Sequence, residues 1–110
     1  MAKPSPVTTL VIYRPKKGKE KQLRSLVLRH APVLKGVGLI TKEPVKVWKA
    51  TDKRSGEVAF VEIFQWKSEK ASDVAHQTPE VMAVWETMGP VLDDLKFSRL
   101  EPLAARGGKG

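Results

Sequence analysis

The sequence predicts an α+β fold of the ferredoxin-like type, in which a four-stranded antiparallel sheet carries its helices on one face. The first observation is the order of the segments: β-type runs and amphipathic helical runs follow one another as β, α, β, β, α, β, with the second helical region in two pieces. The second is the size and balance of the chain, whose 110 residues are 41% hydrophobic and 29% charged. This length and composition are typical of one globular domain.

The N-terminal part of the chain supplies the first strand and a long helix. Residues 7–13 (VTTLVIY) are rich in β-branched and aromatic side chains and lie between two prolines, which predicts a strand. Residues 19–34 carry apolar side chains at helical spacing, and His30 lies on that apolar stripe. Pro32 and the glycines that follow indicate the end of this helix.

The middle of the chain predicts a hairpin. Residues 39–50 form a second extended segment, and Pro44 indicates an edge, a bulge or a break within it. Residues 51–56 (TDKRSG) have the Asp, Ser and Gly of a tight turn. They lead directly into residues 58–66 (VAFVEIFQW), which form an unbroken β-type run and therefore the third predicted strand.

Two helices and a strand are predicted after the hairpin. Ser68 precedes a short helix over residues 69–76, and Thr78 precedes a second helix that starts at Pro79 and ends near Gly89-Pro90. Residues 95–103 then close the sheet. We expect one domain over residues 7–103, with a flexible arm at 1–6 and a flexible tail at 104–110.

The third predicted strand indicates a partner for the sheet. Successive side chains of a strand point to opposite faces, and here both faces are apolar apart from Glu62 and Gln65. The helices of this chain can cover only one face, and a second copy is the simplest cover for the other. We therefore expect a homodimer formed by sheet-to-sheet packing, which makes a dimeric α+β barrel.

Charge and composition exclude several classes of function. The net charge of +8 comes partly from a basic cluster at residues 14–21, but no aromatic residues or nucleic-acid-binding motif accompany it, so we expect a solvated surface and no nucleic-acid partner. No apolar run is long enough to span a membrane, and the N-terminus lacks a signal-peptide pattern. With no cysteine in the chain, we expect a cytoplasmic protein without disulfides or thiolate metal sites.

Three stretches resemble the antibiotic-biosynthesis-monooxygenase (ABM) type of dimeric α+β barrel domain, over residues 7–101. They are VTTLVIYRPKKGKEKQL, APVLKGVGL and FQWKSEKASDVAHQTPEV. In that family an aromatic residue ends the third strand, a Ser-x-x-Ala turn and a helix with a histidine follow, and Ser/Thr-Pro opens the next helix. Trp66, Ser68, His76 and Thr78 match this pattern.

The resemblance implies the fold more strongly than an activity, because relatives include cofactor-free monooxygenases of phenolic polyketides, haem-degrading enzymes and lactone isomerases. The haem-degrading members carry an Asn on the first strand, a Trp in the helix after the third strand and a His about ten residues later. This chain has Ala75 and Trp85 at the two later positions and no Asn on its first strand. We do not expect haem degradation.

Two histidines and one carboxylate are the candidates for chemistry. His76 matches the family's histidine and is the candidate general base, because imidazole titrates near neutrality; the alternative is an exposed or capping histidine. For His30 a structural place in the core is the more common outcome. Glu62 interrupts an apolar face, and an ion pair with Arg99, Arg14 or a lysine of a partner subunit is the simplest explanation.

A group of large side chains could line a cavity for a flat aromatic ligand, although the same residues could simply fill the core and the dimer interface. The candidate substrate-binding residues are Trp66, Trp85, Phe64, Met82, Trp48 and Glu62. We expect no bound metal, because the two histidines and the acidic residues show no ligand spacing. We also expect no cofactor, since phosphate-binding and dinucleotide-binding motifs are lacking.

Two functions remain open from the sequence. The first is a cofactor-independent monooxygenase or isomerase that acts on a small hydrophobic aromatic substrate with His76 as base. The second is a non-catalytic dimeric domain that binds a small hydrophobic ligand or has a structural or stress-related role. The residues do not identify the substrate.

Overall fold

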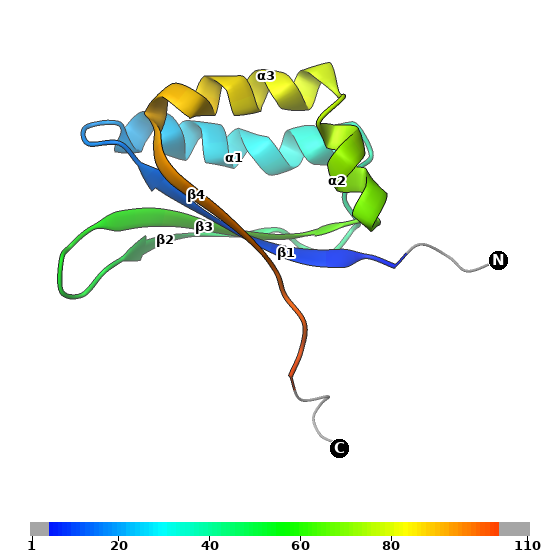
Figure 1. Cartoon of the computed structure of the whole chain (residues 1–110), viewed down its shortest axis with the longest axis horizontal. Coiled ribbons are helices and arrows are strands. Elements are labelled where there is room, and N and C mark those ends of the chain that lie inside the picture. Colours follow the sequence, from blue (N-terminus) through cyan, green and yellow to red (C-terminus); the bar gives the residue numbers. More distant parts are fainter. Residues whose placement is uncertain (1–4, 104–110) are drawn as a thin grey trace.

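The computed structural model describes residues 5–103 and confirms the ferredoxin-like order of elements (Figure 1). The strands are β1 (Val7–Pro15), β2 (Lys46–Thr51), β3 (Val58–Trp66) and β4 (Leu92–Arg99). The helices are α1 (Glu20–Gly36), α2 (Glu69–Ala75), α3 (Pro79–Met88) and the short 3-10 helix η1 (Gly89–Val91). Residues 1–4 of the predicted arm and the whole predicted tail at 104–110 lie outside the described residues.

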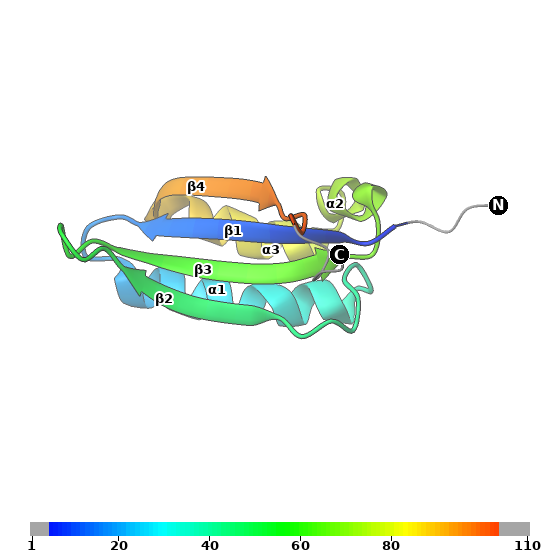
Figure 2. The ribbon, with the colours of Figure 1, turned by 90° about the horizontal axis from the view of Figure 1, so that it is seen from below.

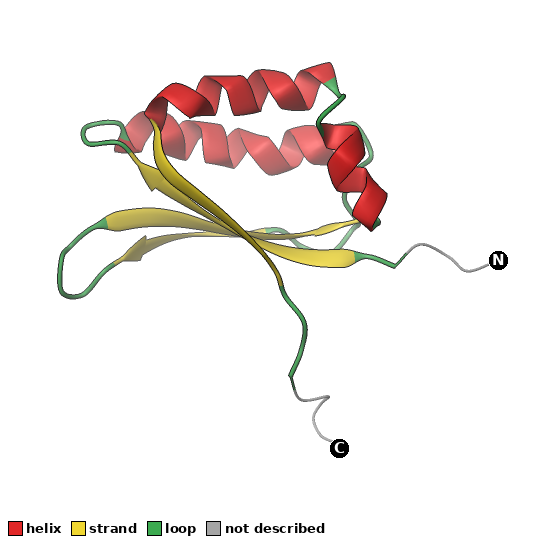
Figure 3. Ribbon diagram, in the orientation of Figure 1, coloured by secondary structure: helices red, strands yellow, loops and turns green. Residues whose placement is uncertain are grey.

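The molecule has two layers, a sheet and a layer of helices on one side of it (Figure 3). The four strands are antiparallel to their neighbours in the order β2-β3-β1-β4, so the first and third strands occupy the centre. Helices α1 and α3 run side by side over the sheet, and α2 lies at the end where β3 finishes (Figure 1). Figure 2, seen from below, shows the strands in front of the helices, so the second face of the sheet has no cover from the described chain.

The strand register decides which side chains share the helix-covered face. Val11 lies opposite Glu62 on β3 and opposite Phe97 on β4, while Tyr13 lies opposite Phe60. Directly opposed residues of antiparallel strands point to the same face. Apart from Ala59, the buried residues of β1 and β3 therefore lie together beneath the helices, where α1 contributes Leu23, Val27 and Leu34 and α3 contributes Val81, Val84 and Met88.

Several element boundaries differ from the sequence-based expectations. Strand β2 begins only at Lys46, after Pro44, and Ile40 forms an isolated bridge to Trp66 instead of a continuous strand. Helix α1 continues through Pro32 to Gly36, because the exposed Pro32 lies in its last turns and disturbs few of its hydrogen bonds. Strand β4 begins at Leu92, directly after the Gly89–Val91 turn.

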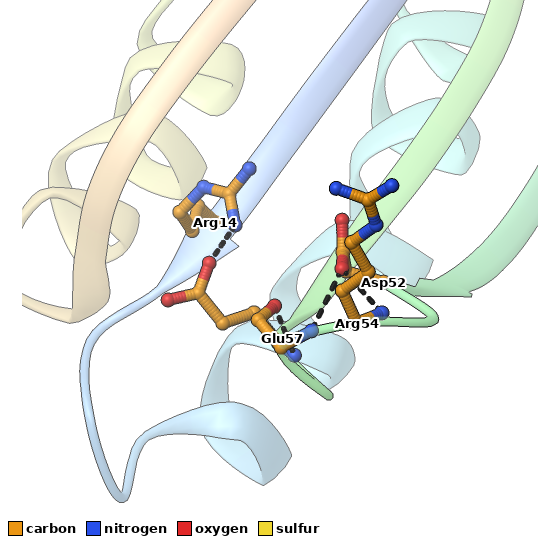
Figure 4. A network of polar contacts seen from close by, with 5 residues as sticks. Arg14, Asp52, Arg54 and Glu57 are labelled. Carbon is orange, nitrogen blue, oxygen red and sulfur yellow. Dashed lines mark hydrogen bonds and ion pairs between the residues drawn. The ribbon is translucent and has the colours of Figure 1, made fainter.

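The hairpin turn between β2 and β3 forms where it is predicted (Figure 4). Asp52 Oδ1 accepts hydrogen bonds from the backbone N–H groups of Arg54 and Ser55 at 2.8 and 2.9 Å, and these bonds lower the pKa of Asp52. Gly56 closes the turn with a φ of +77°, in the left-handed region that glycine adopts without steric cost. Arg14 Nη1 reaches Glu57 Oε1 at 3.3 Å and ties the turn to β1.

None of the helices within residues 5–103 combines the length and the apolar character needed to cross a bilayer.

Candidate functional site

A cavity of about 580 Å³ lies between the helices and the helix-covered face of the sheet. Its size falls in the range of small-molecule sites. It is lined by residues of β1, β3 and β4, of the three α-helices and of the turn after α2: Val7, Thr9, Val11, Tyr13, His30, Phe64, Trp66, Glu69, Ser72, His76, Trp85, Met88, Leu92, Leu95, Phe97, Ser98 and Arg99. Most of these side chains are apolar, so the cavity suits a hydrophobic molecule.

The exposed residues among the lining mark the open side of the cavity. Phe97 on the edge strand β4 is 68% exposed, and His76 at the end of α2 is exposed as well. An ion pair between Arg99 Nη2 and Glu69 Oε1, 2.8 Å long, joins β4 to α2 on this side. Polar groups therefore surround the mouth, whereas the walls are aromatic and aliphatic.

A buried polar cluster lies at the inner wall, formed by Tyr13, His30 and Glu62. Their exposed fractions are 2%, 3% and 0%. The Tyr13 hydroxyl donates to Glu62 Oε1 at 2.5 Å. His30 Nδ1 lies 2.9 Å from the same carboxylate oxygen and 3.2 Å from Tyr13 Oη.

Trp85 fixes the tautomer of His30. The indole Nε1–H of Trp85 donates to His30 Nε2 at 2.9 Å, and indole nitrogen can only donate. His30 Nε2 therefore holds a lone pair, and the proton of the neutral ring is on Nδ1, from which it is donated to Glu62 Oε1. The three side chains form a chain of hydrogen bonds that runs from Trp85 through His30 to the carboxylate of Glu62.

Glu62 is the electrostatic centre of the cluster. Its Oε1 accepts from both Tyr13 and His30, while its Oε2 is buried and has no hydrogen-bond partner within residues 5–103. Burial raises the pKa of Tyr13 far above its ordinary value, and the charge of Glu62 and the hydrogen bond to it raise it further. Tyr13 therefore stays protonated and remains a donor.

The cluster and Trp85, which is bonded to it, come from four different elements. Tyr13 comes from β1, Glu62 from β3, His30 from α1 and Trp85 from α3. The hydrogen-bonded pairs are separated by 17, 32, 49 and 55 residues along the chain. The amphipathic stripe of α1 and the alternation of the strands place each residue on the correct face, and only the folded topology brings them together.

The sequence-derived candidates divide between two sides of the sheet. Trp66 and Phe64 line the cavity, with their ring centroids 5.0 Å apart in an edge-to-face arrangement. His76 and Trp85 also line it, with ring centroids 4.9 Å apart. Trp48 lies on the opposite face, where it is 52% exposed.

Two further candidates lie near the cavity without lining it. Glu62 lies behind the inner wall, where it is hydrogen-bonded to the lining residue His30. Met82 is half-buried on α3 and is not a lining residue, because Val81, Val84 and Met88 form the fully buried side of that helix.

The partners of Glu62 differ from those expected. Arg99 pairs with Glu69 and Arg14 pairs with Glu57, both at the surface, while Glu62 is bound by Tyr13 and His30. The role of Tyr13 and the central position of His30 were missed. The available signal was that Tyr13 and Glu62 occupy inward positions of neighbouring strands and that His30 lies on the apolar stripe facing them.

No three His, Asp or Glu side chains in the described part of the chain gather in the manner of a metal site.

The sequence matches no protein-family model and no curated protein. Its structure is similar to that of SnoaB from Streptomyces nogalater, a cofactor-independent oxygenase, with a TM-score of 0.66, 12% identity and coverage of 89% of this chain and 93% of that one. It is also similar to a dimeric ferredoxin-like protein of unknown function from Bacteroides fragilis, with a TM-score of 0.68, 10% identity and coverage of 91% and 99%.

A third similar structure is a dimeric ferredoxin-like protein of unknown function from Thermobifida fusca, with a TM-score of 0.67, 10% identity and coverage of 88% and 91%. Identities this low establish a shared fold and no shared activity. The ferredoxin-like fold predicted from the sequence is therefore confirmed.

Proposed function

We propose that this chain is a cytoplasmic protein that binds a small hydrophobic aromatic molecule in the cavity and oxygenates it without a cofactor, with His76 as the general base. The observation that carries the proposal is an apolar cavity of about 580 Å³ with aromatic walls and an imidazole at its open side. The description of SnoaB, which shares the fold, as a cofactor-independent oxygenase supports the reaction class.

The cavity provides what such a reaction needs from a protein. The rings of Phe64, Trp66 and Trp85 offer flat surfaces for a fused aromatic substrate. Removal of a proton by His76 would leave an electron-rich anion that reacts with O₂. For a ring methylene, one oxygen atom would form the new carbonyl, and the other would leave as water with the two hydrogens of the methylene.

The second candidate function is ligand binding without catalysis. It is favoured by the state of His76, which is exposed and whose ring has no hydrogen bond to another described residue that would orient it. A general base is usually held in place by such a partner. In this case the aromatic walls would bind the ligand and His76 would lie beside it.

Oxygen uptake separates the two functions. Purified protein is mixed with anthrone- or quinol-type compounds, and the rate is compared with that of His76→Ala. As an enzyme the protein should consume oxygen, and His76→Ala should slow it by about 100-fold or more. Gln77→Ala, an exposed neighbour outside the lining, is the matched control. No turnover supports the binding function, and unimpaired His76→Ala removes His76 as the base.

A second copy of the chain is the partner that we propose for the uncovered face of the sheet. Leu10, Ile12, Val61 and Ile63 are half-buried there and Trp48 is 52% exposed, in mutual register. Two of the similar proteins are described as dimeric. Sheet-to-sheet packing would bury these side chains across a two-fold axis.

Sedimentation tests the dimer. The wild-type chain should sediment as a dimer at micromolar concentration, and Ile12→Lys with Ile63→Lys should yield a folded monomer, because like charges would meet in the interface. Lys35→Glu, at an exposed position in the last turn of α1, controls for a change of surface charge away from this face. A wild-type monomer would contradict this partner.

A further inference from the structure

Packing of the core does not require the buried polar cluster. A carboxylate at 0% exposure loses its hydration, and apolar residues of similar volume would fill the same space at no cost in charge burial. Buried ionisable groups beside a cavity are frequent at functional sites. Here Tyr13 and His30 both reach the cavity wall, and both are bonded to Glu62.

His30 presents a basic lone pair at the inner wall. Its Nδ1–H is donated to Glu62 Oε1, which leaves Nε2 as the acceptor on the side of Trp85. A carboxylate behind an imidazole holds the ring in one orientation and stabilises the imidazolium formed when the far nitrogen takes a proton. Glu62 and His30 have this arrangement. The indole N–H of Trp85 occupies the place at Nε2 that a proton-donating ligand would take.

We propose that His30, backed by Glu62, is a proton acceptor at the inner end of the cavity and that the ligand is a phenol whose O–H replaces the Trp85 N–H at His30 Nε2. This inference rests on the proposed function of the cavity and names the class of its ligand. The phenol proton moves to Nε2, and the O–H electron pair stays on the phenolate oxygen. One imidazolium and one phenolate form from two neutral groups, and Glu62 keeps its charge.

Among the hydrogen-bonded side chains, Trp85 is the one that an incoming ligand can displace. Its side chain is half-buried, whereas Tyr13, His30 and Glu62 are buried. Its ring lies beside both imidazoles, with centroids 6.0 Å from His30 and 4.9 Å from His76. The incoming O–H replaces the displaced N–H one for one, so His30 Nε2 is never left without a partner. An indole N–H does not give up its proton, and a phenol does.

Tyr13 supports the same assignment. Its raised pKa keeps the hydroxyl protonated, so Tyr13 donates to Glu62 and does not compete for the ligand's proton. Glu62 Oε2 has no partner among the described residues, so the carboxylate is only partly neutralised by hydrogen bonds. The remaining field acts on His30, whose Nδ1 lies 2.9 Å from Glu62 Oε1.

A chromogenic naphthol tests the proposal directly. The probe is 4-nitro-1-naphthol, whose phenolate absorbs at longer wavelength than the neutral form, buffered below its solution pKa. Its methyl ether, which has no proton to give, is the matched ligand. The wild-type protein should bind the naphthol in preference to the ether, and the bound naphthol should show the phenolate band.

Three variants test which residues take the proton. His30→Gln and Glu62→Gln should each lower the bound phenolate fraction and the preference for the naphthol by about tenfold, one unit of pKa. Trp85→Phe keeps an aromatic ring and removes the competing N–H, so it should raise that preference. Glu57→Gln, an exposed carboxylate outside the lining, should behave as wild type.

The outcomes separate this inference from the proposed function. If the phenolate band survives His30→Gln and Glu62→Gln and disappears in His76→Gln, the base lies at the mouth, and the inference is overturned while the proposed function stands. If His30→Gln and Glu62→Gln fail to fold, Trp85→Phe is the deciding variant. A preference for the naphthol over its ether that is unchanged or lower in Trp85→Phe then overturns the inference. If neither the naphthol nor the ether binds, the proposed function fails, and the inference fails with it.

Discussion

The two faces of the sheet use the same strands for different purposes. On the helix-covered face, a buried polar cluster and a cavity interrupt the apolar packing. On the other face, the side chains of Leu10, Ile12, Val61 and Ile63 form a half-buried aliphatic strip with Trp48 beside it. Neighbouring residues such as Val11 and Ile12 belong to opposite faces, so strand alternation alone separates the candidate site from the proposed dimer interface.

The largest expected effect is a difference in the stability loss caused by substitutions on the two faces of the sheet. Phe60→Ala should cost about 3–5 kcal/mol of unfolding free energy, because Phe60 is 3% exposed beneath the helices. Val61→Ala, one residue along on the other face and half-buried, should cost roughly 1 kcal/mol or less at low protein concentration. Urea unfolding at nanomolar concentration measures both. Equal losses would contradict the assignment of the faces.

A second prediction concerns alkaline pH and follows from Tyr13, the only tyrosine in the chain. Its pKa is raised on folding, so its contribution to stability is fully present below the unfolded value of about 10 and is lost as the pH rises above it. The tyrosinate absorbance band should therefore appear only together with the loss of circular dichroism. A band that rises near pH 10 in folded protein would place Tyr13 outside the buried cluster.

The smallest effect is expected at the exposed hairpin turn between β2 and β3, which contributes no residue to the cavity lining. Backbone hydrogen bonds lower the pKa of Asp52, so its stabilising effect is present above the ordinary carboxyl pKa of about 3.9 and is lost as the pH falls through the lower folded value. Asp52→Ala should lower the melting temperature slightly at neutral pH, and the difference from wild type should vanish in strong acid. Asp93→Ala, an exposed acid on β4, is the control.

Local sequence patterns predicted the elements well because each depends on neighbouring residues. The run at 58–66 became β3 with the predicted bounds, and TDKRSG formed its turn. The boundaries were predicted less accurately near prolines, because β2 begins only after Pro44 and α1 continues past Pro32.

The candidate site was predictable only in part. His76, Trp66, Phe64 and Trp85 line the cavity as the aromatic pattern suggested, but the face of Trp48 depends on the register between β2 and β3, which the sequence does not reveal. Matching of opposite charges favoured the arginines as partners of Glu62, whereas in the fold its partners are the hydrogen-bonding side chains of His30 and Tyr13.

The central claim is that the cavity beneath the helices binds a flat aromatic molecule, and tryptophan fluorescence tests it most directly. Trp48→Phe removes the tryptophan of the other face and leaves Trp66 and Trp85, both in the cavity wall. Titration of this variant with 4-nitro-1-naphthol should quench the remaining emission in a saturable manner, with one site per chain. Quenching that never saturates, or that matches free tryptophan, would contradict the claim.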